Sequence, residues 1–451
     1  MTTALSLSEA SARQRTGTKF AGVAAGNFMI AMDATILNVA LPDMRHDLHA
    51  SAASLPWTVD AYTVTLAGLV LAVGSVADRW GPRRVYQAAL ALFAVFSVLC
   101  AAAPNAGVLI AGRALLGVPA AGLVPASMAL LAALHPETRV RQQKIGTLVA
   151  VTGLGIAAGP VLGGALVAAG GWRWVFLVNP VIAVLALLVS GGLSAHRAGA
   201  AKPLDLPGLL LSVVGLVALT YGLINGGDDG WGHPTPVVAL AVALTAVVAL
   251  FLVERRAEAP MLPAALLRLG RVRVDLVVAV VSQLVYYGIL YTLTQWMVGT
   301  RALSAFEAGL LFLPMTVPVA FVPMLTGRLV VRFGARPVMF AGFVLDLLGG
   351  AVLLVGPTSL WTVFAVELLI GAGSPLAIPA CIADMSAATP LEYSATGQGA
   401  LNAARMSGTA LGVAVFGTLA SLAAGGLVLV VVTALALAVL GLARRGRTNG
   451  A

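Results

Sequence analysis

The chain has 451 residues, of which 59% are hydrophobic and 10% charged, and its formal net charge is +9 at pH 7. Soluble globular domains carry roughly 25% charged residues, so this composition excludes that class and indicates an all-α, polytopic membrane protein. In a membrane protein, positive charge collects in cytoplasmic loops. We therefore do not take the net charge as a sign of a nucleic-acid partner.

Fourteen segments reach the length of about 20 apolar residues that a membrane-spanning helix needs. They cover residues 20–41, 55–77, 85–103, 107–131, 144–168, 173–194, 206–225, 236–254, 274–297, 306–330, 337–356, 360–384, 394–421 and 424–443. An even number of spans places both termini on the same side of the membrane.

The distribution of Lys and Arg predicts which side that is. With the N-terminus inside, 22 of the 27 basic residues fall in cytoplasmic segments and three, Arg45, Arg173 and Arg301, fall outside. Residues 1–19 are polar and precede a segment too long for a signal-peptide core, so they are expected to form a cytoplasmic tail, as are residues 444–451. The predicted location is the inner or plasma membrane, with both termini in the cytoplasm.

Neither a disulfide nor a metal site is expected. Cys100 and Cys381 both lie within apolar segments, where they are expected to be packing residues. The five histidines fall in loops without the spacing of metal ligands. No cofactor is predicted.

The chain repeats itself. Residues 74–85 match residues 327–338 with five identities at an offset of 253, and Gly155, Gly159 and Gly164 meet glycines at 408, 412 and 417 at the same offset. Duplicated bundles are common in transporters, with the substrate at the interface of the repeats. The predicted organisation is a six-helix bundle at 20–194, a linker with two inserted helices at 195–273, and a second six-helix bundle at 274–443.

The first apolar segment carries a carboxylate, Asp33. An ionisable group at the bilayer centre costs about 2.5–3.5 kcal/mol, so Asp33 is expected to face the protein interior or a water-filled cavity. Arg113, in segment 107–131, needs an anion for the same reason. At a rise of 1.5 Å per residue, Asp33 and Arg113 lie roughly 12 Å and 9 Å from the outer ends of their helices, so their depths allow a pair.

Other ionisable residues in apolar segments are candidates for the same site. Asp60 lies roughly 8 Å from the outer end of its helix, where it either lines a cavity or is solvated at the rim. In the second half, Glu367 occupies the repeat position of Arg113, and Arg405 is expected to serve Glu367 or Asp346. Either acid could equally be a structural partner of that arginine. Asp384, at a cytoplasmic helix end, is expected to be solvated.

Two glycine-containing stretches have a spacing that suggests a specific structure. In the loop after segment 55–77, Asp78 ends a helix and can meet the positive N-terminal end of another helix, although an ordinary charged turn would look similar. In segment 144–168, glycines four apart leave a flat surface for close helix contact, and Pro160 removes a backbone donor and bends the helix. The alternative is a generic small-residue packing face. The residues concerned are Gly74, Asp78, Arg79, Gly81, Arg83 and Arg84 in the loop, and Gly155, Gly159, Pro160, Gly163 and Gly164 in the helix.

A polar and aromatic stripe marks segment 274–297, where Gln283, Tyr287, Tyr291 and Gln295 recur at steps of four. Such a stripe suits either a cavity that stacks flat, partly charged molecules or hydrogen bonding between helices. Asn38, Trp57 and Tyr62 are further residues expected to line the cavity.

In combination, these motifs resemble those of the fourteen-helix drug:proton antiporter family of the major facilitator superfamily, over essentially the whole chain. The resemblance implies the major facilitator fold, with two six-helix bundles and two inserted helices. It also implies that Asp78 latches the bundles together near Ser394 and that residues 153–164 form the antiporter signature. The chain departs from the family at Leu116, a position often polar in relatives, and at Val331, which replaces Asp78 in the second copy of the loop.

The resemblance further implies a proton-coupled antiporter that exports hydrophobic drugs or antibiotics, cationic ones among them, from the cytoplasm by alternating access. Coupling is assigned to Asp33, Asp60, Arg113, Glu367, Asp346 and Arg405. The alternative is proton-coupled uptake or export of a specific metabolite or siderophore by the same fold. An enzyme is not expected, because the chain shows no soluble domain, nucleotide loop or nucleophile–base set. The expected partners are a small molecule, protons and the lipid bilayer, with no nucleic acid, and the expected state is a monomer.

Overall fold

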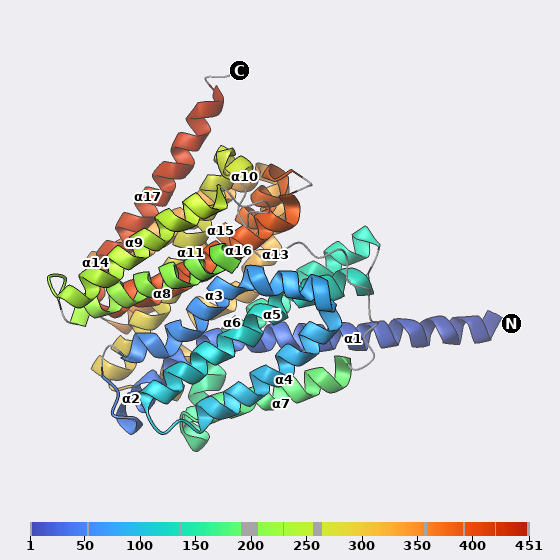
Figure 1. The fold of residues 1–451 in the computed structure, drawn as a ribbon, viewed down its shortest axis with the longest axis horizontal. Helices are drawn as coiled ribbons and strands as arrows, with labels where there is room; N and C mark the ends of the chain where they lie inside the picture. The colour runs from blue at the N-terminus through green and yellow to red at the C-terminus, as the bar shows by residue number, and fades with distance from the viewer. Residues whose placement is uncertain are drawn as a thin grey trace.

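The structure is a computed structural model that describes residues 2–51, 54–135, 137–190, 206–228, 230–255, 264–355, 359–390, 393–419 and 421–448. The regular structure within these ranges is entirely helical. The long helices are α1 (Thr2–Ile36), α3 (Ser54–Trp80), α4 (Pro82–Ala101), α5 (Ala106–Leu134), α6 (Thr138–Gly170), α7 (Trp174–Ser190), α8 (Leu206–Asp228), α9 (Pro234–Glu254), α11 (Gly270–Thr294), α13 (Leu313–Phe333), α14 (Ala335–Val355), α15 (Leu360–Ala388), α16 (Ser394–Gly417) and α17 (Leu422–Thr448) (Figure 1).

Short helical elements join some of the long helices. They are the 3₁₀ turn η1 (Asn38–Ala40), α2 (Leu41–Asp47), α10 (Ala264–Arg268), the π-helical turn η2 (Gln295–Thr300) and α12 (Ala305–Leu311). The expected tail at 1–19 is not a separate element, because α1 already begins at Thr2.

Eleven helices of the described ranges are long and apolar enough to cross a membrane, which makes this a polytopic membrane protein. Helix α7 is apolar but has 17 residues. Helices α3 and α16, with 27 and 24 residues, fall on two further expected spans but are not among the eleven.

Local sequence explains where several helices begin. Gly81 and Gly334 occupy the same position in the two copies of the loop motif, and both have a positive φ, 89° and 84°, which glycine adopts without strain. The chain therefore reverses at the same position in each copy. Ser304 begins α12 with a capping box, in which its hydroxyl accepts from the Glu307 backbone N–H and the Glu307 carboxylate accepts from the Ser304 backbone. This backbone hydrogen bond, helped by the Ser304 hydroxyl, lowers the pKa of Glu307.

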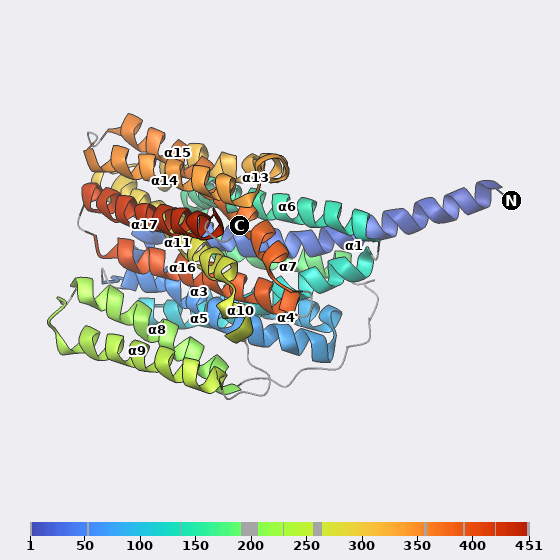
Figure 2. The ribbon, with the colours of Figure 1, turned by 90° about the horizontal axis from the view of Figure 1, so that it is seen from above.

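The two halves of the chain use the same helix contacts. In the first half α1 packs against α6 and α7, α5 packs against α3 and α4, and α4 packs against α7. In the second half α11 packs against α16 and α17, α15 packs against α13 and α14, and α14 packs against α17. The sequence repeat is thus matched by a repeat of packing partners. Helices α8 and α9, between the halves in sequence, lie side by side along one edge of the molecule, and α8 also contacts α3 and α16 (Figures 1 and 2).

The hydrophobic packing between the two halves differs at the two ends of the molecule. At the end that holds α2 and α12, here called the α2 end, one buried cluster draws residues from both halves, among them Met32 and Ile36 of α1 and Phe312 and Met315 of the second half. At the opposite end, here called the terminal end, each half has a core of its own. The halves are therefore closed on one another at the α2 end.

Candidate functional site

A buried ion pair lies at the centre of the first half. The guanidinium of Arg113 on α5 donates through Nη1 to Oδ2 of Asp33 on α1 at 2.6 Å, and the side chains are 0% and 1% exposed. The second carboxylate oxygen of Asp33 accepts a hydrogen bond from Asn179 Nδ2 on α7 at 2.8 Å. The pairing expected from helix depth is therefore confirmed, with a third side chain added to it.

Neighbouring helices fix the orientation of this pair. Arg113 Nε donates to the Thr58 carbonyl oxygen on α3 at 3.0 Å, and its guanidinium lies 4.4 Å from the centre of the Tyr62 ring. Asn179 also donates to Ser97 Oγ on α4 at 3.0 Å. Arg113 Nη2 and the Tyr62 hydroxyl have no hydrogen-bond partner among the described residues. Buried donors without partners are costly, so these two groups are free to donate to a bound molecule.

Asn179 was not identified from the sequence. The sequence feature that could have identified it is that Asn179 is the single amide side chain in the apolar helix α7, directly before Pro180. Polar side chains inside spanning helices hydrogen-bond to neighbouring helices, so an isolated asparagine at this depth identifies a partner for a buried charge.

Replacing Asn179 with leucine is expected to reduce transport by roughly tenfold or more, because a hydrogen bond to a charged group contributes about 1.5–3 kcal/mol. Initial transport rates at matched protein levels measure the effect. Asn225→Leu on α8 is the matched control, since the Asn225 amide bonds to Tyr221 O of its own helix and is solvent-accessible. Equal rates for the two variants would argue against a role for Asn179 at the Asp33 carboxylate.

Asp60 on α3 is 0% exposed, so the rim interpretation is wrong. Its Oδ1 accepts from the Thr63 hydroxyl at 3.4 Å, while Oδ2 has no partner in the described part of the chain. Asp60 therefore lies in the protein interior. It makes no direct contact with Asp33 in the described structure.

The second half holds Asp346 on α14 and Glu367 on α15, which are 0% and 1% exposed. The expected pairing of Arg405 with one of them is wrong for the described residues, where its Nη1 instead lies 3.4 Å from Asn402 Oδ1. Asp346 lies in the contact between α14 and α15, next to Gly373. Arg405, by contrast, belongs to α16, which packs against α11.

The expectation for Asp384 is also wrong. This acid is 5% exposed, and it forms ion pairs with Arg271 of α11 and with Arg336 Nε of α14, the latter at 3.8 Å. Both cysteines are free and buried, as expected of packing residues.

The glycines of α6 fit two different neighbours. A Cβ on Gly155, Gly159 or Gly163 would lie 2.0–2.6 Å from atoms of α1, whereas one on Gly164 would lie 2.4 Å from the Ala305 carbonyl oxygen of α12. The repeat copy behaves alike: Cβ atoms on Gly408 and Gly412 would meet α11, and one on Gly417 would lie 3.0 Å from Pro56 of α3. In each half, the last glycine of the motif therefore packs against the other half.

The remaining residues of the α6 motif and of the loop motif lie at different contacts. Pro160 of α6 packs closely against Gly309 of α12, because a Cβ added to Gly309 would lie 2.3 Å from the Pro160 carbonyl oxygen. Arg83 and Arg84 lie in the first turn of α4, where Arg83 is half-buried and Arg84 is exposed. The side chains of Asp78, Arg79 and Ser394, and the surroundings of Gly74, lie outside the described residues, and with them the expected latch.

The expected cavity-lining residues separate into buried and outward-facing ones. Gln283, Tyr287 and Tyr291 on α11 are 8%, 6% and 3% exposed, while Gln295 lies in the π-helical turn. Trp57 packs against Tyr221 of α8, with ring centres 6.0 Å apart. Asn38 is buried in η1, where its amide donates to the Thr35 carbonyl oxygen at 3.2 Å.

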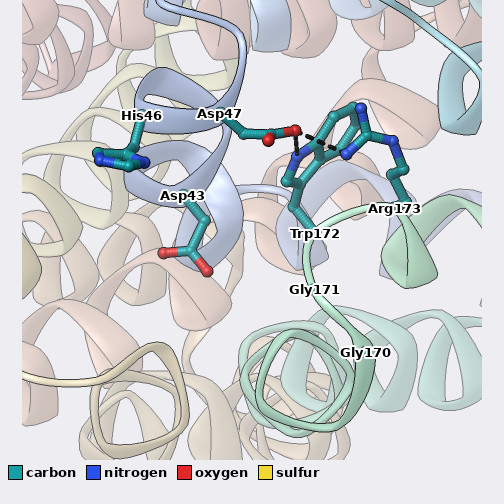
Figure 3. Close-up of a pocket in the computed structure, with 7 residues that line it drawn as sticks. All are labelled: Asp43, His46, Asp47, Gly170, Gly171, Trp172 and Arg173. Atoms are coloured by element: carbon teal, nitrogen blue, oxygen red, sulfur yellow. Dashed lines mark hydrogen bonds and ion pairs between the residues drawn. The ribbon is translucent and has the colours of Figure 1, made fainter.

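A pocket of about 320 Å³ lies at the α2 end, away from the Asp33 pair (Figure 3). Asp47 of α2 accepts hydrogen bonds there from Trp172 Nε1 at 2.9 Å and from Arg173 Nη1 at 2.6 Å, and the Arg173 guanidinium stacks on the Trp172 ring. These contacts tie α2 to the turn between α6 and α7. Across the described residues, no group of three or more His, Cys, Asp or Glu side chains is placed to hold a metal ion.

Comparison with protein families gives one match that spans most of the chain. The model of the Major Facilitator Superfamily matches residues 23–254 and 276–450. Among solved structures, a peptide transporter POT in complex with sulfate aligns with a TM-score of 0.69 at 14% identity, covering 93% of this chain and 94% of that one. The human organic anion transporter MFSD10 aligns with a TM-score of 0.65 at 18% identity, covering 94% and 99%. At these identities the structures show the fold alone.

Curated relatives cover a similar length. The chain is 33% identical over 405 residues to the methylenomycin A resistance protein of Bacillus subtilis, an alignment that covers 89% of this chain and 87% of that protein. It is 35% identical over 408 residues to the puromycin resistance protein pur8 of Streptomyces alboniger, covering 88% and 80%. It is 31% identical over 408 residues to the tetracenomycin C resistance and export protein of Streptomyces glaucescens, covering 88% and 74%.

Proposed function

The chain belongs to the major facilitator superfamily, and we propose from that starting point that it is a proton-coupled antiporter exporting hydrophobic drugs or antibiotics from the cytoplasm. Relatives named for resistance to methylenomycin A, puromycin and tetracenomycin C support export of small organic antibiotics. The three relatives are named for three different antibiotics, so the substrate class proposed here is broad and not a single molecule.

One observation carries the proton coupling: the buried Asp33 carboxylate, held by Arg113 and Asn179. The low-dielectric interior opposes a carboxylate charge, while the adjacent guanidinium balances it. A carboxyl group in that setting can hold either a negative charge paired with Arg113 or a proton. This is the pair of states that an antiporter needs.

The proposed mechanism is competition at this group. A proton arriving from outside neutralises Asp33 and frees the Arg113 guanidinium, whereas a drug arriving from the cytoplasm displaces that proton, which leaves to the cytoplasm. Asp60, Glu367, Asp346 and Arg405 are proposed as further charged groups of the pathway, and Tyr62, Tyr287, Gln283 and Tyr291 as the surface that contacts the drug. The two halves would then tilt against each other, which would expose the Asp33 site to each side of the membrane in turn.

We assign fourteen spanning helices: the eleven long apolar ones together with α3, α7 and α16. They form two six-helix bundles, α1 to α7 without α2 and α11 to α17 without α12, and α8 and α9 are the insert between them. The excess of Lys and Arg at the terminal end supports a cytoplasmic location for that end. The shared core then closes the outer side, so the conformation described is one that is shut to the exterior.

Uptake or export of a specific metabolite by the same fold is the second candidate. The glycine packing of α6 on α1 is compatible with transport in both directions, so the direction of flux must be measured. The names of the relatives favour drug export.

The test is expression in a bacterial host that lacks its own drug pumps, with susceptibility measured for a panel of dyes and antibiotics. We expect several-fold higher tolerance to hydrophobic compounds, and loss of that tolerance when an uncoupler collapses the proton gradient. Drug accumulation in cells that express the protein would instead support uptake, and export unaffected by the uncoupler would refute proton coupling.

A further inference from the structure

Two buried acidic residues lie on neighbouring helices, α11 and α15, at the terminal end of the second half, far along the chain from Asp33. Asp275 lies in the second turn of α11 and is 0% exposed, and Asp384 lies in the last turns of α15 and is 5% exposed. We propose that these two carboxyl groups share one proton and form a second proton-binding site, through which protons leave to the cytoplasm; the transport role of this site rests on the function proposed above.

The two acids lie on facing surfaces of α11 and α15. Arg271, one turn before Asp275 on α11, pairs with Asp384, and Cys381, one turn before Asp384 on α15, donates to the Asp275 backbone carbonyl oxygen. Both oxygens of Asp275 lack a donor in the described part of the chain. Ionised carboxylates only accept hydrogen bonds, so two of them that face each other in a buried position repel unless one carries a proton. With one proton present, Asp275 donates to Asp384 and the buried acid has a partner.

The surrounding charges allow that proton to leave. Asp384 is paired with Arg271, whose side chain is 34% exposed, and with Arg336 Nε at 3.8 Å. After release to water at the exposed face of Arg271, two carboxylates face two guanidiniums and the group of four carries no net charge. Both protonation states therefore avoid a bare buried carboxylate without a cationic neighbour.

The other titratable groups near Asp275 do not supply a hydrogen-bond partner for its carboxyl group. Cys381 Sγ donates to the backbone carbonyl oxygen of Asp275 at 3.1 Å, which fixes α15 against α11 without touching the carboxyl group. Arg405 belongs to α16, which also packs against α11, and its charge lies near Cys381 and Tyr287.

The first half has no equivalent pair. At the repeat offsets, Asp275 and Asp384 correspond to Gly22 and Leu130, while Arg336 corresponds to Arg83. A Cβ on Gly22 would lie 3.2 Å from the Ser190 backbone nitrogen of α7, so that position is closed by helix packing in the first half. The acid at 275 is thus not a requirement of the repeated fold.

The first experiment measures the proton directly. Infrared difference spectra of the purified, reconstituted protein between acidic and alkaline pH should contain a carbonyl-stretch band of the protonated Asp275–Asp384 pair beside that of Asp33, and Asp275→Asn should remove the band of the pair. Ser282→Ala is the matched control, because Ser282 is buried on the same face of α11 two turns further on and cannot titrate in this range. Asp275→Glu keeps a carboxyl group and should keep the band. Size-exclusion elution of each variant checks that it is folded.

The second experiment measures transport in inverted vesicles, where the bath takes the place of the cytoplasm. A single released proton gives a rate that changes by up to about tenfold per unit of bath pH. We expect Asp275→Asn to flatten this profile to less than about twofold per unit, and Ser282→Ala to retain it.

The outcomes separate the two proposals. A wild-type protein that exchanges drug for protons, together with an Asp275→Asn variant that keeps both the band and the pH profile, would overturn the second site and leave the antiporter intact. Loss of the band in Asp275→Glu would equally overturn it. A wild-type protein that shows the band but moves no protons with drug would refute the antiporter and leave the site in place.

Discussion

Asp33→Asn is expected to abolish proton-coupled export. Asparagine matches aspartate in size, but its single carbonyl oxygen can accept from only one of Arg113 and Asn179, and its NH2 group then faces the other donor. It can neither carry the negative charge nor bind the proton. The variant also leaves the Arg113 guanidinium buried without its anion, a change that costs about 3–5 kcal/mol in folded proteins. Drug-driven proton movement in vesicles is the measurement, and it should fall to the level of vesicles without the protein.

Because lower stability could also reduce transport, rates must be compared at equal amounts of monodisperse protein. Asp43→Asn is the matched control, since Asp43 lies in α2, ten residues further along, with an exposed side chain. If Asp33→Asn retained proton-coupled export, the Asp33 carboxyl group would not be the group that couples export to protons.

Gly164→Val is expected to prevent closure at the α2 end. A Cβ on Gly164 would lie 2.4 Å from the Ala305 carbonyl oxygen and 2.7 Å from Phe306 Cα, and the conflict is with backbone that cannot rotate away. Overpacking of this kind costs about 1–3 kcal/mol, which lowers the ratio of closed to open conformations by roughly fivefold to 150-fold. Amide hydrogen exchange should therefore accelerate in α12 and η1, and export should fall in parallel.

The same helix offers a control for valine itself. Gly146 also lies in α6, and a Cβ there would meet nothing within 4 Å, so Gly146→Val should leave exchange and export unchanged. Equal hydrogen exchange in α12 for Gly164→Val and the wild type would mean that this contact does not hold the halves together.

The parts of the fold and site that could be predicted depend on distances along a single helix. Asp33 and Arg113 were matched by counting residues from the ends of their own helices, because a helix rises by a constant amount per residue. The glycine repeat was visible for a similar reason: a spacing of four places glycines on one face. The sequence does not show which helix that face contacts. The contacts of Gly164 and Gly417 with the other half could therefore be seen only in the structure.

The wrong expectations arose where rotation about the helix axis or a distant helix decides the outcome. Asp384 looked solvated because it is near a helix end, yet Arg271 from α11 covers it. Arg405 was expected to serve Glu367 or Asp346, but its helix α16 packs mainly against α11, and the sequence does not show which helix lies beside it. Trp57 faces α8, a helix that has no counterpart in the repeat and whose position no repeat argument could supply.

The placement of α8 makes the two flanks of the molecule unequal. Helices α3 and α16 meet on one flank, and α8 lies across both of them, while α6 meets α12 and α13 on the other. A lipophilic compound dissolved in the bilayer thus finds the first flank screened by an extra hairpin. The opposite flank has no such hairpin over it, and there α6 and α13 contact each other directly, with Gly153 bringing the two backbones close together.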